Sequence, residues 1–259
     1  MIADRSSDHD PVALRQLLVG LLAQPSPTID SSKAARLERL CRALVADLEL
    51  SGVTITLMVA DGSQALAATS DPRIAALDAV QFDVGEGPSR DAYVGGRPVL
   101  VPDLAASDGR WPGFHSASQA HGLAAVHAFP LQQGAVRLGA LTCYAVAVLP
   151  LNRQEISRCV VYAEVVTRYL IEDGAGGDPG SAQRDFLERD VQIRTEVYQA
   201  QGMVMVELQV SLAEALVRMR AGAFAAGVSL NQLAVEIVAG RRSLADNSAV
   251  VADPDVPDA

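Results

Sequence analysis

The stretch AAVHAFPLQQGAVRLGALTCYAVAV, residues 124–148, holds two apolar runs separated by a short polar segment. Apolar runs bounded by turn residues are typical of buried strands. Between the runs, QQGA offers Gly134 for a tight turn, where the backbone often needs a positive φ. The stretch therefore predicts an antiparallel hairpin.

Three segments upstream also have strand character. They are VTITLMVA, QALAATS and RPVLVPDL, at residues 53–60, 64–70 and 97–104. The first is β-branched and apolar, and ADGS after it supplies a turn, which predicts a second hairpin. Together with residues 124–148, these segments predict five mostly antiparallel strands.

Helices are predicted on both sides of this β-rich region. Apolar residues recur at helical spacing over 32–50 and again over 152–172. Apart from one strand, the long stretch from Phe82 to Leu123 shows no regular pattern and is expected to be irregular. Helix, sheet and helix together predict an α+β domain.

Glycine and proline mark a domain boundary. The segment GAGGDPGSA has four glycines and a proline, which is the composition of a linker. The predicted organisation is an N-terminal arm with a short helix over 11–23, an α+β domain, the linker, a helical domain and a disordered acidic tail, at residues 1–31, 32–173, 174–182, 183–244 and 245–259.

Only helical patterns occur between Arg184 and Leu244. A first helix is expected to carry an apolar stripe made of Phe186, Ile193, Val197, Ala200, Val204 and Leu208. Gly202 lies within this helix, although a helical glycine costs about 1 kcal/mol relative to alanine. Small residues at Ala200 and Gly202 let another backbone approach closely, either from within the domain or from a partner.

Two further helices have clear start and stop signals. In SLAE, Ser211 is a cap and Glu214 follows three residues later, which predicts a capping box. Gly227 is expected to end this helix in the left-handed conformation. SLNQ repeats the starting signal with Ser229 and Gln232. Three helices in succession predict an all-α domain.

Composition excludes several classes of protein. The 259 residues carry a net charge of -10, which argues against a nonspecific polyanion binder. The three cysteines lack metal or redox spacing, so buried thiols in a reducing cytoplasm are expected. The apolar run at 12–23 is too short to cross a bilayer and lacks the features of a signal peptide. A cytoplasmic protein without a membrane partner is therefore expected.

The segment AQGMVMVELQVSLAEALVRMRAGAFAAGVSLNQLAVEIV, residues 200–238, resembles the ANTAR domain. The matching residues are Ala200, Gly202, Met205, Ser211, Glu214, Ala215, Arg220, Ala223, Leu230 and Ala234. ANTAR domains are small three-helix RNA-binding modules of bacterial antitermination regulators. The resemblance implies a homodimer that holds paired hairpins in a nascent transcript and prevents a terminator stem from forming.

Upstream, GEGPSRDAYVGGRPVLVPDL, RWPGF and HAFPLQQGAVRLGAL resemble the GAF domains that are fused to ANTAR domains in actinobacteria. The resemblance implies a GAF-like antiparallel sheet flanked by helices, with an unknown small molecule bound between sheet and helices. The candidate pocket residues are Phe82, Tyr93, Trp111, Phe114 and His127, with an ordinary core as the alternative. A bound ligand is expected to alter the pairing of helix 152–172 across a dimer.

The ANTAR resemblance also implies an RNA site. Its candidate residues are Ala200, Gln201, Gly202, Arg218, Arg220, Asn231, Arg241 and Arg242. Residues 184–244 contain seven arginines and seven acidic residues, so their net charge is 7 − 7 = 0. Recognition is therefore expected to depend on the fit to unpaired loop bases more than on charge. Gln201 stands where many relatives have lysine, and the arginines near helix ends can instead favour the helix C-termini.

No enzymatic site, cofactor or metal site is predicted. No nucleophile, base and orienting acid occur together, and the histidines lack the spacing of metal ligands. Ser89 stands where related sequences often have a cysteine, so thiol-based sensing is not expected there. Three alternatives remain: a dimeric signalling module whose C-terminal helices bind a protein, a methionine sulfoxide reductase using Cys143 and Cys159, and a DNA-binding helix-turn-helix.

Overall fold

The chain folds as two compact units, the first comprising Met1–Val59 and Ser63–Asp190 and the second comprising Ala60–Gly62 and Val191–Ala259. The computed structural model describes residues 10–24, 32–107, 109–172, 183–188 and 194–245. The predicted linker and nearly all of the predicted acidic tail lie outside the described residues. Each unit is described below by itself.

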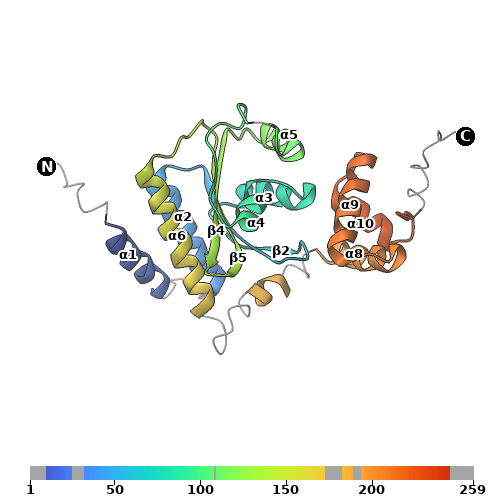
Figure 1. Ribbon diagram of the computed structural model, residues 1–259, viewed down its shortest axis with the longest axis horizontal. Helices are drawn as coiled ribbons and strands as arrows, with labels where there is room; N and C mark the ends of the chain where they lie inside the picture. Colours follow the sequence, from blue (N-terminus) through green and yellow to red (C-terminus); the bar gives the residue numbers. More distant parts are fainter. Residues whose placement is uncertain (1–9, 25–31, 108, 173–182, 189–193, 246–259) are drawn as a thin grey trace, which may run out of the picture. The chain divides into compact units, whose positions relative to one another are not determined.

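A five-stranded antiparallel sheet forms the middle of the first unit, with strand order β2-β1-β5-β4-β3 (Figure 1). Its strands are β1 (Gly52–Met58), β2 (Gln64–Thr69), β3 (Val99–Val101), β4 (Ala125–Gln133) and β5 (Val136–Ala145). Both predicted hairpins form, because β1 pairs with β2 and β4 pairs with β5. Gly134 lies in the second turn with φ 59°, as its sequence context predicts.

The two central strands approach each other closely at Gly139 of β5. Gly139 pairs with Leu57 of β1, and an added Cβ would lie 1.9 Å from the carbonyl oxygen of Thr56. No side chain fits in that space, so glycine fixes the register between the two strands here.

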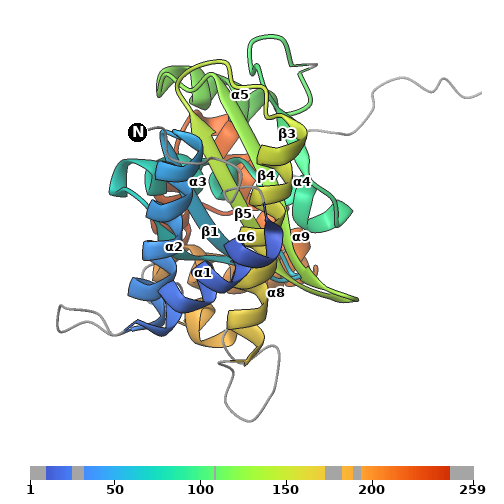
Figure 2. The same cartoon turned by 90° about the vertical axis from the view of Figure 1, so that its left-hand side faces the viewer.

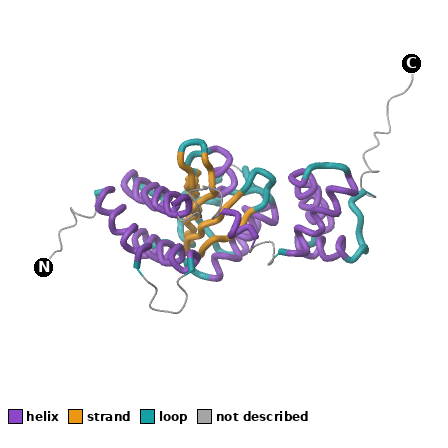
Figure 3. Tube along the Cα trace, turned by 90° about the horizontal axis from the view of Figure 1, so that it is seen from below, coloured by secondary structure: helices purple, strands orange, loops and turns teal. Residues whose placement is uncertain are grey.

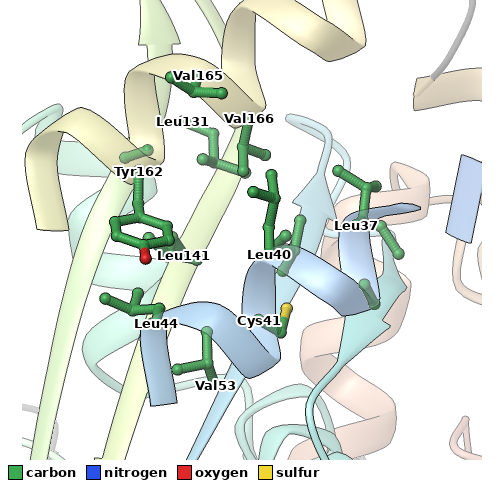
Figure 4. Close-up of a cluster of buried hydrophobic side chains, with 14 of the residues drawn as sticks. Leu37, Leu40, Cys41, Leu44, Val53, Leu131, Leu141, Tyr162, Val165 and Val166 are labelled. Atoms are coloured by element: carbon green, nitrogen blue, oxygen red, sulfur yellow. The ribbon is translucent and has the colours of Figure 1, made fainter. Parts of the chain in front are cut away.

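Three helices form a layer on one face of the sheet. α2 (Lys33–Leu48) and α6 (Arg153–Glu172) pack on the strands, and α1 (Pro11–Ala23) packs on both helices (Figure 2). Their buried side chains form the main core with β1, β4 and β5. Figure 4 shows Leu40 and Leu44 of this core beside Tyr162 and Val166. These helices match the predicted ones because their apolar residues recur at regular helical spacing.

The opposite face carries three helices that the sequence pattern does not reveal. They are α3 (Pro72–Val84), α4 (Pro88–Gly95) and α5 (Pro112–Ala120). The prediction of an irregular stretch from Phe82 to Leu123 is therefore wrong. Each helix begins with a proline in its first turn, where the missing N–H is no loss. α3 buries the polar residues Asp78 and Gln81, which interrupts its apolar periodicity.

The second unit contains α8 (Thr195–Leu208), α9 (Leu212–Ala226) and α10 (Leu230–Val238) (Figure 3). Ser211 caps α9, Gly227 ends it with φ 64°, and Ser229 forms a capping box with Gln232, all as predicted. Glu214 does not behave as predicted, because its carboxylate binds Arg218 Nε at 2.8 Å. The described residues 194–245 are therefore helices and turns, consistent with an all-α second unit.

The first unit extends further along the chain than the sequence predicts. Residues 183–188 are helical, and Phe186 is buried in the main core of the first unit. Gln183 Nε2 also donates to the Leu138 carbonyl at 3.1 Å. The predicted boundary at residue 183 is therefore too early, and Phe186 does not belong to the apolar stripe of α8. Ile193 of that stripe lies outside the described residues.

Candidate functional site

Strand register separates the side chains on the two faces of the sheet. Thr54 pairs with Thr142, and both face α3 and α4. Neighbouring residues Val53 and Cys143 face α2 and α6, where they belong to the main core. Threonines therefore alternate with apolar residues in β1 and β5, and one face of the sheet is polar near its centre.

A buried carboxylate lies against this polar face. Asp78 of α3 is 3% exposed and accepts hydrogen bonds from Thr54 Oγ1 at 3.1 Å, Thr56 Oγ1 at 2.6 Å and the Tyr144 hydroxyl at 3.0 Å. Three hydroxyl donors satisfy a carboxylate that would otherwise be costly to bury. Burial and the charge of Asp78 raise the pKa of Tyr144 well above its ordinary value. Tyr144 therefore keeps its proton and donates a hydrogen bond to Asp78.

Gln81 extends this network one turn along α3. Its Nε2 donates to Ser89 Oγ at 2.7 Å and to the Tyr144 hydroxyl at 2.9 Å. Its Oε1 accepts from the backbone N–H of Ser89 at 2.9 Å, and Ser89 Oγ lies 2.7 Å from Thr142 Oγ1. The network joins α3, the start of α4 and two strands through buried polar groups. Because its members satisfy one another, it rigidifies this face of the sheet.

Four of the five predicted pocket residues lie on this side, but none lines a cavity described below. Trp111 and Phe114 are buried in an apolar cluster with Leu104 and Val126. Phe82 is also buried, and Tyr93 is half-buried. Trp111 Nε1 donates to Asp91 Oδ2 at 3.1 Å, and the Arg110 guanidinium stacks 4.5 Å from the indole centroid. Phe82, Trp111 and Phe114 therefore belong to the buried core, which is the alternative left open by the sequence.

His127 lies on the other face of the sheet, so its assignment to the same pocket is wrong. It pairs with Cys143, and Phe129, two residues further along β4, packs in the main core. His127 Nε2 lies 2.8 Å from the Leu149 carbonyl, to which a neutral ring donates. Burial lowers the pKa of His127, although the Leu149 carbonyl and Glu155 act in the opposite direction. The histidine is a buried neutral donor at neutral pH.

Open space lies elsewhere in the first unit. A cavity of about 640 Å³ lies between α1, α2, α6 and the end of β4. Its lining residues are Arg15, Val19, Leu22, Ala23, Arg36, Gln132, Gln133, Glu164, Val165, Thr167, Arg168, Tyr169 and Glu172. Two other cavities measure about 430 Å³ beside α3 and about 250 Å³ beside the start of α6. The largest of the three has the volume of a typical ligand site.

Two predicted RNA contacts are buried inside the second unit. Ala200 is fully buried, and Gln201 is 2% exposed with its Nε2 donating to the Leu212 carbonyl at 2.7 Å. A side chain held in this way cannot also read a base edge. The assignment of Ala200 and Gln201 to the RNA surface is therefore wrong, because both stabilise the packing of α8 on its neighbours.

Gly202 differs from both of these neighbours. An added Cβ would meet no atom within 4 Å, so packing inside the unit does not require glycine at this position. The interpretation of Gly202 as an internal close contact is wrong. A side chain would fit at Gly202 without meeting another part of the unit.

The remaining predicted RNA residues lie at the surface or close to it. Asn231 and Arg241 are exposed, and Arg220 is half-buried. Arg218 pairs with Glu214 and Arg242 pairs with Glu236, at 2.8 and 3.4 Å. The same unit also exposes large apolar side chains, and the most exposed of these is Phe224 of α9, at 86%. The sequence prediction did not include Phe224, although its position outside the apolar spacing of α9 was a usable signal.

The cysteines lie together in the main core. Cys41, Cys143 and Cys159 are reduced and buried. A hydrogen bond with Cys159 and burial raise the pKa of Cys143, and burial raises the pKa of Cys41. Such thiols are poor nucleophiles, since reactivity requires an accessible thiolate.

The described part of the chain contains neither a cluster of metal ligands nor a single membrane-spanning helix. Within the described ranges, no group of three His, Cys, Asp or Glu side chains is arranged to hold a metal ion. No single described helix has both the length and the apolar composition of a membrane span, and α8 with α9 passes such a test only jointly, across a bend of 104°.

Comparison with solved structures supports the fold. The GAF domain of a phosphoenolpyruvate-protein phosphotransferase from Coxiella burnetii has a TM-score of 0.50 and 14% identity, covering 64% of this chain and 96% of that one. The corresponding Acinetobacter domain has a TM-score of 0.47 and 11% identity, covering 68% and 99%. The free methionine-R-sulfoxide reductase from Neisseria meningitidis has a TM-score of 0.45 and 12% identity, covering 71% and 95%. At such identities, the first of these likenesses shows the fold alone.

Comparison by sequence identifies the first unit. No curated protein matches the chain. Residues 31–157 match the family model of the GAF domain, a module that senses small molecules or other signals. This range contains all five strands and the helices α2 to α5. The chain therefore carries a GAF domain over residues 31–157.

Proposed function

We propose that the protein is a signal-responsive RNA-binding regulator that stabilises antiterminator hairpins in nascent transcripts. In this proposal the GAF domain is the sensor, and α8, α9 and α10 form an ANTAR-type RNA-binding domain. The sensor acts by binding rather than by catalysis, and the raised pKa of the buried Cys143 supports this view over a thiol enzyme.

The observation that carries the proposal is which residues form the buried core of α8, α9 and α10. The small residues that resemble the ANTAR pattern are its buried residues: Ala200, Ala215, Ala223 and Ala234 are all at most 4% exposed. Leu230, also part of the pattern, is buried beside them. Alanines at these positions let three helices pack closely. The resemblance therefore covers the residues that specify this three-helix arrangement.

The surface of the second unit supports a nucleic-acid partner. Arg241 and Asn231 are exposed, so a phosphate or a base edge can reach them. Phe224 offers an aromatic face on which an unpaired base can stack. Recognition of this kind depends on shape and stacking more than on charge. It is therefore compatible with the zero net charge of residues 184–244.

The proposed mechanism is competition between two folds of one transcript. A homodimer holds two stem-loops, one in each ANTAR-type domain, and the bound RNA cannot then form its terminator stem. Binding shifts the population toward the antiterminator fold by the difference in affinity for the two folds. About 1.4 kcal/mol of that difference changes the ratio of the two folds tenfold.

A second candidate function is binding of a protein by the same helices. Val206 of α8 is 70% exposed and Phe224 of α9 is 86% exposed, so both side chains are free to contact a protein partner. A neutral surface fits a protein partner as well as it fits RNA. If the helices bind a protein and not RNA, added hairpin RNA should not displace that protein.

Selection from an RNA pool tests the proposed function. The full chain would be mixed with a pool of RNAs that present two stem-loops with randomised loops, and retained RNA would be sequenced after several rounds. We expect enrichment of particular loop sequences in both stems, and weaker retention by the double variant Arg241→Ala with Arg242→Ala. Failure to enrich any loop, with equal retention of unstructured RNA, would contradict RNA recognition.

A further inference from the structure

We propose that the cavity between α1, α2 and α6 binds a small amphipathic anion, whose charged group is held by Arg36. The cavity measures about 640 Å³ and lies in the first unit, which we call the GAF unit because it contains the GAF domain. Arg36, Gln132 and Gln133 of the lining lie inside residues 31–157, and the rest belongs to α1 and α6. The cavity lies on the face of the sheet opposite the aromatic residues that the sequence suggested as a pocket. The inference rests on the proposed sensor function and names its site and the chemical class of its ligand.

The strongest indication is the environment of Arg36. Its Nε is buried without a hydrogen-bond partner in the described part of the chain. Its Nη1 lies 3.5 Å from the Tyr169 hydroxyl, at the outer limit of a hydrogen bond. No described carboxylate forms an ion pair with this guanidinium. A half-buried cation without a counter-charge is unfavourable, and an anion bound in the cavity would supply that charge.

The other charged groups of the cavity already have partners. Arg15 forms an ion pair with Glu164, and Arg168 forms one with Glu172. Three arginines against two glutamates leave a net charge of 3 − 2 = +1 in the lining. Arg36 carries this remaining charge, so the ligand is expected to carry one matching negative group.

One wall of the cavity is apolar, so we expect the ligand to have an apolar part as well as a charged group. Val19 and Leu22 of α1 line the cavity, together with Val165 of α6. Val19 is 50% exposed although it lies beside this space. Covering Val19 would remove apolar surface from water. An inorganic anion would leave these apolar side chains in contact with water. A carboxylate or sulfonate attached to an apolar body would cover them.

The position of the cavity links two ends of the GAF unit. Its walls belong to α1, in the N-terminal arm, and to α6, the last helix before residues 173–182. A ligand between them holds α1 against α6 and changes the packing of the helix that leads toward the second unit. The signal therefore enters at the helical layer rather than between the sheet and α3.

Two fluorescent probes test the inference on the full chain. 8-Anilinonaphthalene-1-sulfonate has an aromatic body and one negative group, and N-phenyl-1-naphthylamine has nearly the same body without the charge. We expect Arg36→Gln to weaken binding of the sulfonate at least about tenfold, as for loss of a charge-assisted hydrogen bond, and to change binding of the amine less than about twofold. Arg36→Lys should restore part of the sulfonate affinity.

Arg42→Gln is the matched control, because Arg42 also lies on α2 but is exposed, paired with Glu38 and outside the cavity lining. It should change binding of either probe less than about threefold. Equal losses of both probes in Arg36→Gln, unchanged binding of both, or no binding to the unmodified chain would overturn the inference. Neither probe measurement involves RNA, so a failure of hairpin selection would reject the antiterminator proposal and leave this site standing.

Discussion

The side-chain amide of Gln201 donates a hydrogen bond of 2.7 Å to the Leu212 carbonyl, across the turn that joins α8 to α9. Gln201 is thereby removed from solvent at a position where the ANTAR resemblance suggested an RNA contact. The amide fixes the start of α9 relative to α8. Its role is to hold the three helices in place, which leaves recognition to residues on the surface.

Replacing Gln201 by alanine should therefore act on stability first. Gln201→Ala removes a buried hydrogen bond and should destabilise the second unit by about 1–2 kcal/mol. Hydrogen exchange of backbone amides in α8 and α9 measures this loss directly. Asn231→Ala is the control, because Asn231 is exposed on α10. Unchanged exchange in Gln201→Ala would show that the amide does not hold the two helices.

Gly202→Ala should have the opposite effect on stability. No atom lies within 4 Å of an added Cβ, and alanine is favoured over glycine in a helix by about 0.8–1.0 kcal/mol. Exchange of the α8 amides should slow accordingly. If an RNA base packs directly against Gly202, the same variant should bind selected hairpins more weakly. A variant that is more stable and binds equally well would remove Gly202 from the RNA surface.

The buried network around Asp78 should be the most sensitive polar feature of the GAF unit. Asp78→Ala leaves three buried hydroxyl groups without their acceptor and should cost about 3 kcal/mol or more. Urea unfolding followed by the fluorescence of the single tryptophan, Trp111, reports on this unit. Glu38→Ala, on the exposed side of α2, should cost less than about 0.5 kcal/mol. Similar midpoints for the two variants would refute a stabilising network.

His127 should make the stability of the GAF unit depend on pH. Its pKa is lowered in the folded protein, so below about pH 6.5 the unfolded chain takes up a proton before the folded chain does. The stabilisation is thus complete above pH 6.5 and is lost as the pH falls below it. His127→Gln should flatten this part of the pH profile in urea unfolding, whereas His121→Gln, at an exposed position, should not. A profile unaffected by His127→Gln would contradict the assignment.

Much of the fold follows from regular apolar spacing in the sequence. The strands, α1, α2, α6 and the three helices of the second unit are predictable because each buries one continuous apolar face. α3 is not, since it directs Asp78 and Gln81 at a polar part of the sheet. Prolines at the starts of α3 and α4 and glycines after their ends were usable signals.

The candidate sites were less predictable, because they depend on contacts between distant residues. His127 was placed in the wrong pocket because the facing direction of β4 requires its register with β5. The cavity at Arg36 brings together residues from α1, α2 and α6, and no local motif marks it. Gln201 was misassigned because its partner, Leu212, lies beyond the end of its own helix.

The most direct test of the proposed function is crosslinking of the full chain to RNA in cells, followed by sequencing of the bound fragments. The account predicts recovery of transcripts with two adjacent stem-loops, the second overlapping a terminator stem, and reduced recovery in the double variant Arg241→Ala with Arg242→Ala. Recovery of no RNA above background, together with capture of a protein through Phe224 that Phe224→Ser abolishes, would contradict it.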